Sequence, residues 1–254
     1  MLKVRVIPTL LWKDFGLVKG VSFDSWRRIG PLLPAIKVYN SREVDELILV
    51  DIMASREGNI PDYESLDDFA DECFIPLTVG GGITNLSQII SLLNSGADKI
   101  SLNSALFDNP CLVDKASYQF GVQCIVVSID VRRLGDRFIC FSHAGTQNTQ
   151  RETVSWAREL ADRGAGEILL TSIDRDGTMQ GYDLELIEKV VSAVNIPVIA
   201  SGGAGNYQHM IDAVKQAGAS SVAAASIFHF TEQTPSGAKV AMRDEGIPVR
   251  QNLI

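Results

Sequence analysis

Eight short apolar runs rich in β-branched residues recur along the chain, separated by stretches that include amphipathic helical patterns. The runs are VRVIPTL (4–10), ELILVDI (46–52), PLTV (76–79), KISLNS (99–104), CIVVSID (124–130), EILLTSI (167–173), PVIAS (197–201) and SVAAAS (221–226). They are apolar throughout rather than alternating, which is typical of strands that helices cover on the outside. The clearest helical stretches are 85–97, 153–165 and 184–194. This alternation predicts an α/β fold, a (β/α)8 TIM barrel, whereas an open doubly wound sheet would more usually show a G-x-G-x-x-G turn.

Parts of the sequence occur twice at a nearly constant spacing. IPLTVGGGI begins at Ile75 and IPVIASGGAG at Ile196, so they lie 196 − 75 = 121 residues apart. ELILVDI and EILLTSI match at the same offset, and GADKISLNSALF matches GASSVAAASIFH at an offset of 122. Three matching units in one order predict two homologous half-barrels, about 1–120 and 121–254, within a single domain of residues 1–254.

Glycines end the third and seventh predicted strands, at 80–82 and 202–203. In such a barrel the loops after the strands converge on the mouth, where chemistry takes place. Glycines there let backbone N–H groups approach a ligand, and helix N-termini favour anions. Two matched turns therefore predict two phosphate sites on opposite sides of the mouth. By the same position, Asp51, Asp174 and Asp176 are also expected to face the mouth.

Charged residues open four of the predicted strands. They are Arg5, Glu46, Lys99 and Glu167. Each precedes an apolar run, so we expect all four at the opposite rim of the barrel, where two cations and two anions neutralise one another. From the residues alone, a stabilising plug at the barrel floor is favoured over a polar aperture.

Composition excludes several classes of function. With 23 basic and 31 acidic residues, the net charge is −8, which argues against a nucleic-acid surface. The basic clusters SWRRIG (25–30) and VRR (131–133) are typical of a solvated face. No apolar run is long enough to cross a membrane, and four cysteines without C-x-x-C spacing indicate reduced thiols in a cytoplasmic protein. The three histidines lack ligand spacing, so we expect no metal and no cofactor.

Several motifs together resemble the cyclase subunit of imidazole glycerol phosphate synthase, over essentially the whole chain. They include FIPLTVGGGI, GADKISLNSA, GVQCIVVSID, GAGEILLTSIDRDGTMQGYDLELI, NIPVIASGGAGN and AASIFHF. The resemblance implies a barrel that docks a glutaminase subunit on its bottom face. It also implies that ammonia travels up through the barrel to a bis-phosphorylated substrate at the top.

The resemblance assigns roles to individual positions. It makes Arg5, Glu46, Lys99 and Glu167 an ammonia gate, which favours the aperture over the plug, and it makes Asp98 a glutaminase contact. Lys19 falls in a mobile loop after the first strand. The implied phosphate-binding residues are Gly82, Asn103 and Ser104 on one side, and Asp176, Gly177, Gly203 and Ser226 on the other.

One catalytic position departs from the family. The repeat sets Leu11 against Asp130, and the resemblance implies aspartates at both, acting as the acid and base that close the imidazole ring. Leucine cannot transfer a proton, so Asp130 remains as the one catalytic carboxylate of the pair. Thr9 and Trp12 flank the change, which predicts a more apolar and bulkier mouth on this side.

Three hypotheses follow. The stretch VIPTLLWKDFGLVKG resembles a divergent branch of the family that works beside a glutaminase and a sugar amidotransferase. This favours a subunit that relays ammonia towards an acetamidino modification of a nucleotide sugar in surface polysaccharide. The first alternative is an active cyclase of histidine biosynthesis that recruits Asp14 or Asp176 as its second acid. The second is a non-catalytic scaffold that holds a bis-phosphate or a partner.

Overall fold

The fold is a closed barrel of parallel strands surrounded by helices. The computed structural model describes residues 3–14, 16–42 and 44–250. The barrel strands are β1 (Arg5–Lys13), β4 (Leu47–Asp51), β5 (Leu77–Gly80), β6 (Lys99–Leu102), β7 (Ile125–Leu134), β10 (Glu167–Ser172), β11 (Val198–Ser201) and β12 (Ser221–Ala224). Each pairs with its neighbours in parallel, and the β7–β10 pairing closes the ring. The predicted TIM barrel is confirmed, with each barrel strand inside or close to its predicted run.

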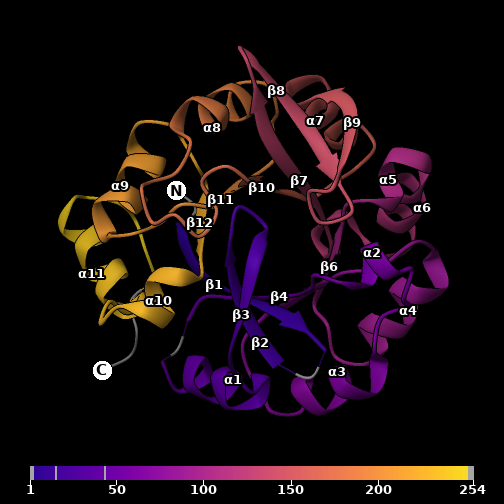
Figure 1. Cartoon of the computed structure of the whole chain (residues 1–254), viewed down its shortest axis with the longest axis horizontal. Coiled ribbons are helices and arrows are strands. Elements are labelled where there is room, and N and C mark those ends of the chain that lie inside the picture. The colour runs from indigo at the N-terminus through magenta and orange to yellow at the C-terminus, as the bar shows by residue number, and fades with distance from the viewer. Residues whose placement is uncertain (1–2, 15, 43, 251–254) are drawn as a thin grey trace.

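An outer ring of helices surrounds the strands (Figure 1). The longer helices are α1 (Leu32–Ser41), α3 (Tyr63–Ala70), α4 (Leu86–Asn94), α6 (Cys111–Phe120), α7 (Thr153–Asp162), α8 (Leu184–Val191), α9 (Tyr207–Lys215) and α11 (Pro235–Asp244). Shorter ones are α2 (Ala54–Glu57), α5 (Ala105–Asp108), η1 (Val122–Cys124) and α10 (Ser226–Phe230). Among the described residues, no helix has the length and apolar character needed to span a membrane.

Side chains of the strands alternate between two cores. One core lies between strands and helices, and there Trp12 packs edge-to-face on Phe69 of α3, with ring centroids 5.5 Å apart. Trp12 therefore points away from the mouth, and the expectation that it fills the mouth is wrong. The second core joins residues of six different barrel strands, so it lies inside the ring; its members are Ile7, Ile48, Val126, Leu169, Ile199 and Ala223.

Two antiparallel hairpins extend the barrel strands. β2 (Gly16–Val21) pairs with β1 and β3 (Asp24–Gly30), while β8 (Arg137–Ser142) pairs with β7 and β9 (Gln147–Glu152). The β2–β3 hairpin lies across the front of the ring in Figure 1. Its tip reaches the second half of the chain, where the Ser22 N–H donates to the carbonyl of Asp176 at 2.9 Å. Lys19 lies on β2 of this hairpin, and the mobility that the resemblance implied for this loop stays a prediction.

The repeat has counterparts in backbone geometry. Asn85 and Asn206, 206 − 85 = 121 residues apart, cap α4 and α9 with nearly the same backbone angles. In each, the side chain accepts a hydrogen bond from the N–H three residues on, as N-cap residues do. The division into two half-barrels is a prediction that these matched caps accord with.

Candidate functional site

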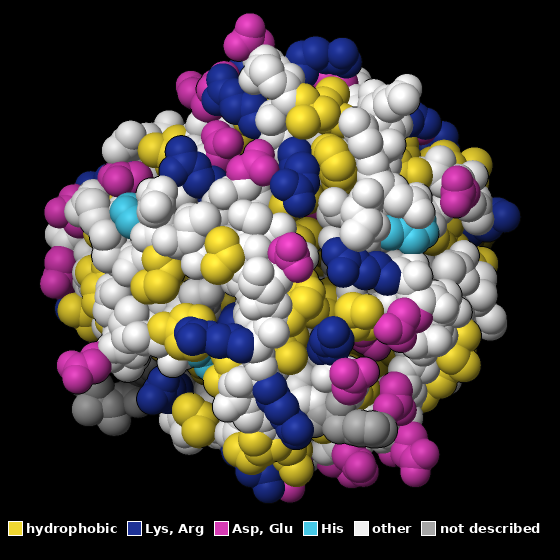
Figure 2. All heavy atoms as spheres, in the orientation of Figure 1, with side chains coloured by type: hydrophobic (Ala, Val, Ile, Leu, Met, Phe, Trp, Pro, Cys, Tyr) yellow, Lys and Arg dark blue, Asp and Glu magenta, His cyan; other side chains and the backbone are white. Residues whose placement is uncertain are grey.

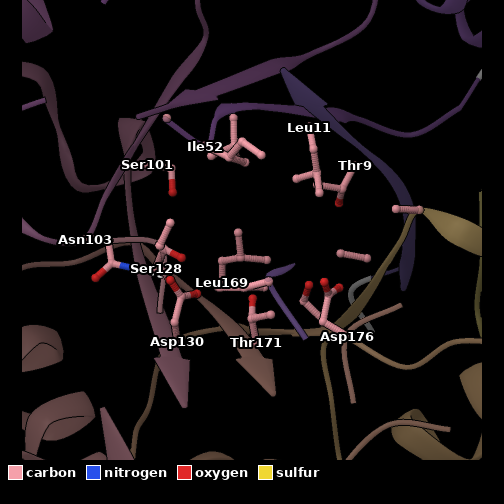
Figure 3. A pocket seen from close by; sticks show the side chains of 18 of the residues that line it. Thr9, Leu11, Ile52, Ser101, Asn103, Ser128, Asp130, Leu169, Thr171 and Asp176 are labelled. Carbon is pink, nitrogen blue, oxygen red and sulfur yellow. Dashed lines mark hydrogen bonds between the residues drawn. The ribbon is translucent and has the colours of Figure 1, made fainter. Parts of the chain in front are cut away.

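A cavity opens at the carboxyl ends of the barrel strands, beneath the β2–β3 hairpin. Residues from all eight barrel strands or the loops after them line it (Figure 3). The wall includes every position that the resemblance assigned to phosphate binding: Gly82, Asn103, Ser104, Asp176, Gly177, Gly203 and Ser226. The structure thus brings together residues up to 226 − 82 = 144 positions apart, and their role towards phosphate stays a prediction.

The strand-end glycines occupy positions that no other residue could take without strain. Gly81 and Gly203 have φ angles of 114° and 113°, in the region that glycine alone adopts readily. A Cβ on Gly81 would stand 2.4 Å from the carbonyl oxygen of Asp51, and one on Gly203 would stand 2.2 Å from that of Gly181. The two turns therefore present bare backbone to the cavity on its two sides, as predicted from the sequence.

Asp130 on β7 is the buried carboxylate of the cavity. Burial raises the pKa of Asp130, hydrogen bonds from Asn103 and Ser128 oppose this rise, and the neighbouring Asp176 adds to it, so that the pKa lies at about 7. The Asn103 side-chain N–H donates to Asp130 Oδ2 at 2.7 Å. Asn103 therefore orients Asp130 with one of its two amide N–H donors. A carboxyl with a pKa near neutrality can both take and give a proton at physiological pH.

Leu11 stands across the cavity from Asp130 (Figure 3). With Val50 and Ile52 it makes an apolar wall, while Asp130 and Thr171 face it from the polar side. The opposition that the sequence repeat predicted is therefore present, and it joins a carboxyl to a hydrocarbon side chain. No proton can pass to or from the β1 side through residue 11.

A second titratable pair lies under the hairpin. Lys19 is 2% exposed, and its Nζ donates to the carbonyl oxygen of Thr9 at 2.9 Å. Burial lowers the pKa of Lys19 to about 7, with Asp176 opposing the shift. Burial raises the pKa of Asp176 to about 6, and Lys19 opposes that shift. The hairpin thus brings the buried Lys19 close to Asp176. Asp176 is one of the two substitute acids proposed from the sequence, and it lines the cavity.

The other predicted carboxylates have structural partners. Asp51 Oδ1 accepts the backbone N–H groups of Met53 and Ala54 at 2.9 and 3.0 Å, so it shapes the loop after β4 while lining the cavity. Asp174 accepts the Arg133 N–H at 2.9 Å and does not line the cavity, so its predicted position is wrong. Asp14, the other proposed substitute acid, does not line it either.

Some cavity groups have no hydrogen-bond partner in the described part of the chain. Four buried side-chain polar atoms there lack one, and three of them belong to cavity residues: Thr9 Oγ1, Trp26 Nε1 and Asn103 Oδ1. Such groups are costly unless a bound molecule satisfies them. Sequence reasoning assigned Trp26 to a solvated basic cluster, which was wrong because the hairpin folds its ring over Gly20 and into the cavity wall.

The face around the cavity carries scattered cations. Figure 2 shows several Lys and Arg side chains around the middle of the face on which the hairpin lies, although the chain as a whole is acidic. Arg27 on β3 lies over the ring of Phe230, with its guanidinium carbon 4.0 Å from the ring centroid. Positive charge around a concave site raises the local concentration of anionic ligands.

The four charged strand openers meet at the opposite end of the barrel. Arg5 contacts Glu46 at 2.6 Å and Glu167 at 3.0 Å, and Lys99 contacts the same two carboxylates at 3.0 and 3.3 Å. We call these four residues the quartet. Alternating signs close a square whose formal charges sum to zero, as predicted. The apolar layer inside the ring separates the quartet from the cavity.

Asp98 lies beside the quartet, one residue before Lys99. Its carboxylate Oδ2 accepts the Leu77 N–H at 2.8 Å, and the residue is exposed. The position fits a surface contact, and the glutaminase contact itself stays a prediction.

The structure offers few groups for a metal. Within the described ranges, no set of three or more His, Cys, Asp or Glu side chains is arranged to hold a metal ion. The four cysteines, at 73, 111, 124 and 140, are free thiols.

Comparisons with known proteins all indicate the same family. A family model described as "Histidine biosynthesis protein" matches residues 5–234. The chain is 48% identical over 250 residues to imidazole glycerol phosphate synthase subunit HisF of Hyphomonas neptunium, covering 98% of this chain and 99% of that protein. It is 46% identical over 256 residues to the subunit of the same name from Caulobacter vibrioides, covering 100% and 98%. The likeness therefore extends along the two chains from end to end.

Proposed function

The chain belongs to the histidine biosynthesis protein family as a HisF-like subunit of imidazole glycerol phosphate synthase, and from that premise we propose that it closes the imidazole ring of its relatives' product. Ammonia would come from a glutaminase subunit docked at the quartet end. The observation that carries the proposal is the meeting, in one cavity, of two matched glycine turns and a buried carboxyl with a pKa near neutrality.

The layered interior suits a neutral nucleophile. Ammonia carries no charge, so it can cross the apolar layer between the quartet and the cavity, whereas ammonium would lose its hydration there. The quartet would admit ammonia at the lower end, and Asp130 would exchange protons with the ligand at the upper end. The turns at Gly82 and Gly203 would hold a phosphate each, and Lys19 with Asp176 would supply the second proton-transfer group that Leu11 cannot.

A second candidate rests on Leu11 alone. If two facing carboxylates are required for ring closure, this chain relays ammonia to another enzyme and does not cyclise. A sugar amidotransferase that modifies a nucleotide sugar of surface polysaccharide is the destination predicted from the sequence. The similar proteins are named imidazole glycerol phosphate synthase subunit HisF instead, which favours ring closure.

Assays with the chain and its glutaminase distinguish these functions. Ring closure predicts imidazole glycerol phosphate from the bis-phosphorylated precursor with ammonium chloride, and at least about a hundredfold loss in Asp130→Asn. The relay predicts no such product, together with a glutaminase that this subunit stimulates. If neither product nor stimulation is observed, the chain is a scaffold. Leu11→Asp is the informative variant, because it should create cyclase activity in a relay subunit and leave an active cyclase within about tenfold of its starting rate.

A further inference from the structure

A second buried ion pair lies at the quartet end, on the outer side of the barrel wall. Lys239 Nζ of α11 is 2.9 Å from Asp45 Oδ1, and the two side chains are 5% and 3% exposed. In every other ion pair observed between described residues, at least one partner is more than 15% exposed. Removing one partner of a pair held this far from water strongly destabilises the folded protein, because the remaining charge is buried without compensation.

Asp45 connects the two strands that carry one half of the quartet. Its second oxygen, Oδ2, accepts the backbone N–H of Val6 at 3.0 Å. The observed register of β1 with β4 begins only at Thr9 and Ile48, so below these residues the carboxylate takes the place of the ladder. Val6 and Asp45 are each one residue from a quartet member, Arg5 and Glu46 respectively.

Because side chains alternate along a strand, the Asp45–Val6 hydrogen bond outside the barrel lies next to quartet residues that point inward. Val6 belongs to the outer core, so its neighbour Arg5 points to the inside of the ring. Asp45 meets α11 on the outside, and the adjacent Glu46 meets Arg5 at 2.6 Å on the inside. The Asp45 carboxylate therefore ties together, from outside the barrel, the chain segments that carry Arg5 and Glu46.

The end of the chain braces the same point. Val4, next to Arg5, forms a parallel bridge with Val249, and its N–H donates to the carbonyl of Pro248 at 2.7 Å. Both anchors come from α11 and the segment after it, so the C-terminal part of the chain holds the start of β1 at two places.

We infer that Asp45 and Lys239 are positioning residues for the quartet, fixing Arg5 and Glu46 from outside the barrel in the arrangement that controls entry of ammonia. The inference rests on the proposed function of the quartet as an ammonia gate. It adds that passage depends on a helix that touches neither ammonia nor the ligand. A buried hydrogen-bonded network of this kind transmits a change because it has few alternative arrangements.

The test separates glutamine-driven from ammonium-driven turnover in the complex with the glutaminase. Lys239→Met should lower glutamine-driven turnover about tenfold while ammonium-driven turnover stays within about twofold, since free ammonia can enter from the mouth. Adding Asp45→Asn to this variant should restore glutamine-driven turnover, because the amide oxygen still accepts the Val6 N–H and the buried negative charge of Asp45 is removed. Lys215→Met is the matched control: it removes the exposed Lys215–Glu245 pair between α9 and the end of α11 and should change neither rate.

Equal loss of the two rates in K239M, or no loss in either, would overturn the inference. If the unmodified complex has no turnover with either nitrogen source, the proposed function fails and the inference is decided by a crystal structure of K239M. That structure should show the Arg5–Glu46 contact broken or shifted. An undisturbed quartet would refute the positioning role whatever the reaction is.

Discussion

Burial decides which proton chemistry the cavity can do. Removal from water raises the pKa of Asp130, and the hydrogen bond from Asn103, which stabilises the anion, does not offset this rise, to which the neighbouring Asp176 adds. The resulting pKa of about 7 lies where a general acid–base group is most effective. Leu11 opposite makes this single group more important, because nothing on the β1 wall of the cavity titrates at that position.

The same burial predicts a pH-dependent cost in stability. The pKa of Asp130 is raised from 3.8 in the unfolded chain to about 7, so its contribution to stability is fully present below about pH 4 and is lost as the pH rises through 7. Asp130→Asn does not titrate. The variant should therefore gain stability relative to the unmodified protein between pH 4 and 7, by at most about 4 kcal/mol, and the difference should stay constant above that.

Urea unfolding of the two proteins at pH 5 and pH 8 measures this difference. If the difference in the free energy of unfolding between the two proteins were the same at pH 5 and pH 8, Asp130 would be ionised in the folded chain at both pH values. Its assignment as a proton donor near neutrality would then be wrong. The result bears on stability alone, so it is independent of whether the chain cyclises.

At the scale of single residues, the sequence predicts the location of groups that lie at the end of a strand or on one face of it. The glycines at 81 and 203, the quartet and the Leu11–Asp130 opposition all follow from a strand's end or its alternation. Thr9 was expected at the mouth and does line the cavity, whereas Trp26 was not identified, because its place there depends on how the hairpin folds back over β1. Trp12 was predicted at the mouth, but it follows Leu11 on the strand and therefore points to the opposite face, where it packs on Phe69.

Among the elements, the β2–β3 hairpin is the one that turns an open barrel mouth into a covered cavity. Three of its non-glycine residues, Ser22, Phe23 and Ser25, have positive φ angles of 51°, 62° and 54°. Such angles cost free energy, so contacts across the mouth must offset it. Ser22 bonds to Asp176, and Phe23 packs against the cluster of Ile139, Phe141 and Ile173.

Gly20→Ala should release the hairpin from this position. A Cβ on Gly20 would stand 2.2 Å from the Asp24 carbonyl oxygen and 2.7 Å from the Trp26 ring, so β3 must move. Lys19 would then lose its burial. We expect trypsin to cut after Lys19 at least about tenfold faster than in the unmodified protein, since cleavage needs local opening.

Gly30→Ala, in the same hairpin, is the control. Nothing lies within 4 Å of a Cβ at this position, so trypsin should cut this variant at the unmodified rate. Equal rates in all three proteins would show that the hairpin does not depend on this contact.

Barrel strands and hairpins differ in how far sequence predicts them. The eight barrel strands are buried on two sides and read as continuous apolar runs, so each was located. β3 and β9 are mostly exposed and polar, with sequences DSWRRIG and QNTQRE, and no apolar run marks them. Their stability comes from pairing with an existing strand, which is a tertiary effect that a local pattern does not contain.

The whole molecule is organised in layers along one axis. The quartet lies at the amino ends of the strands, the apolar layer above it, and the cavity with Asp130 at the carboxyl ends. The sequence predicts these layers because each strand runs through all three in the same direction. It does not predict the tie from α11 to Asp45, since Lys239 and Asp45 are 239 − 45 = 194 residues apart and no repeat relates them.

The two carboxylates of the quartet should differ in how much of the barrel depends on them. Glu46 is 2% exposed and accepts hydrogen bonds from Arg5, Lys99 and, at 2.7 Å, Thr78. Glu167 is 15% exposed, and among the described residues its ion-pair partners are Arg5 and Lys99. Replacing either by glutamine leaves the quartet with one excess positive charge, which water can screen beside Glu167 far better than beside Glu46. We expect Glu46→Gln to lower the free energy of unfolding by about 3 kcal/mol and Glu167→Gln by about 1 kcal/mol, measured by urea unfolding at pH 7. Equal losses would contradict this expectation, because they would mean that both carboxylates reach solvent to the same extent. Such hydration would also weigh against the proposed role of the quartet in admitting ammonia.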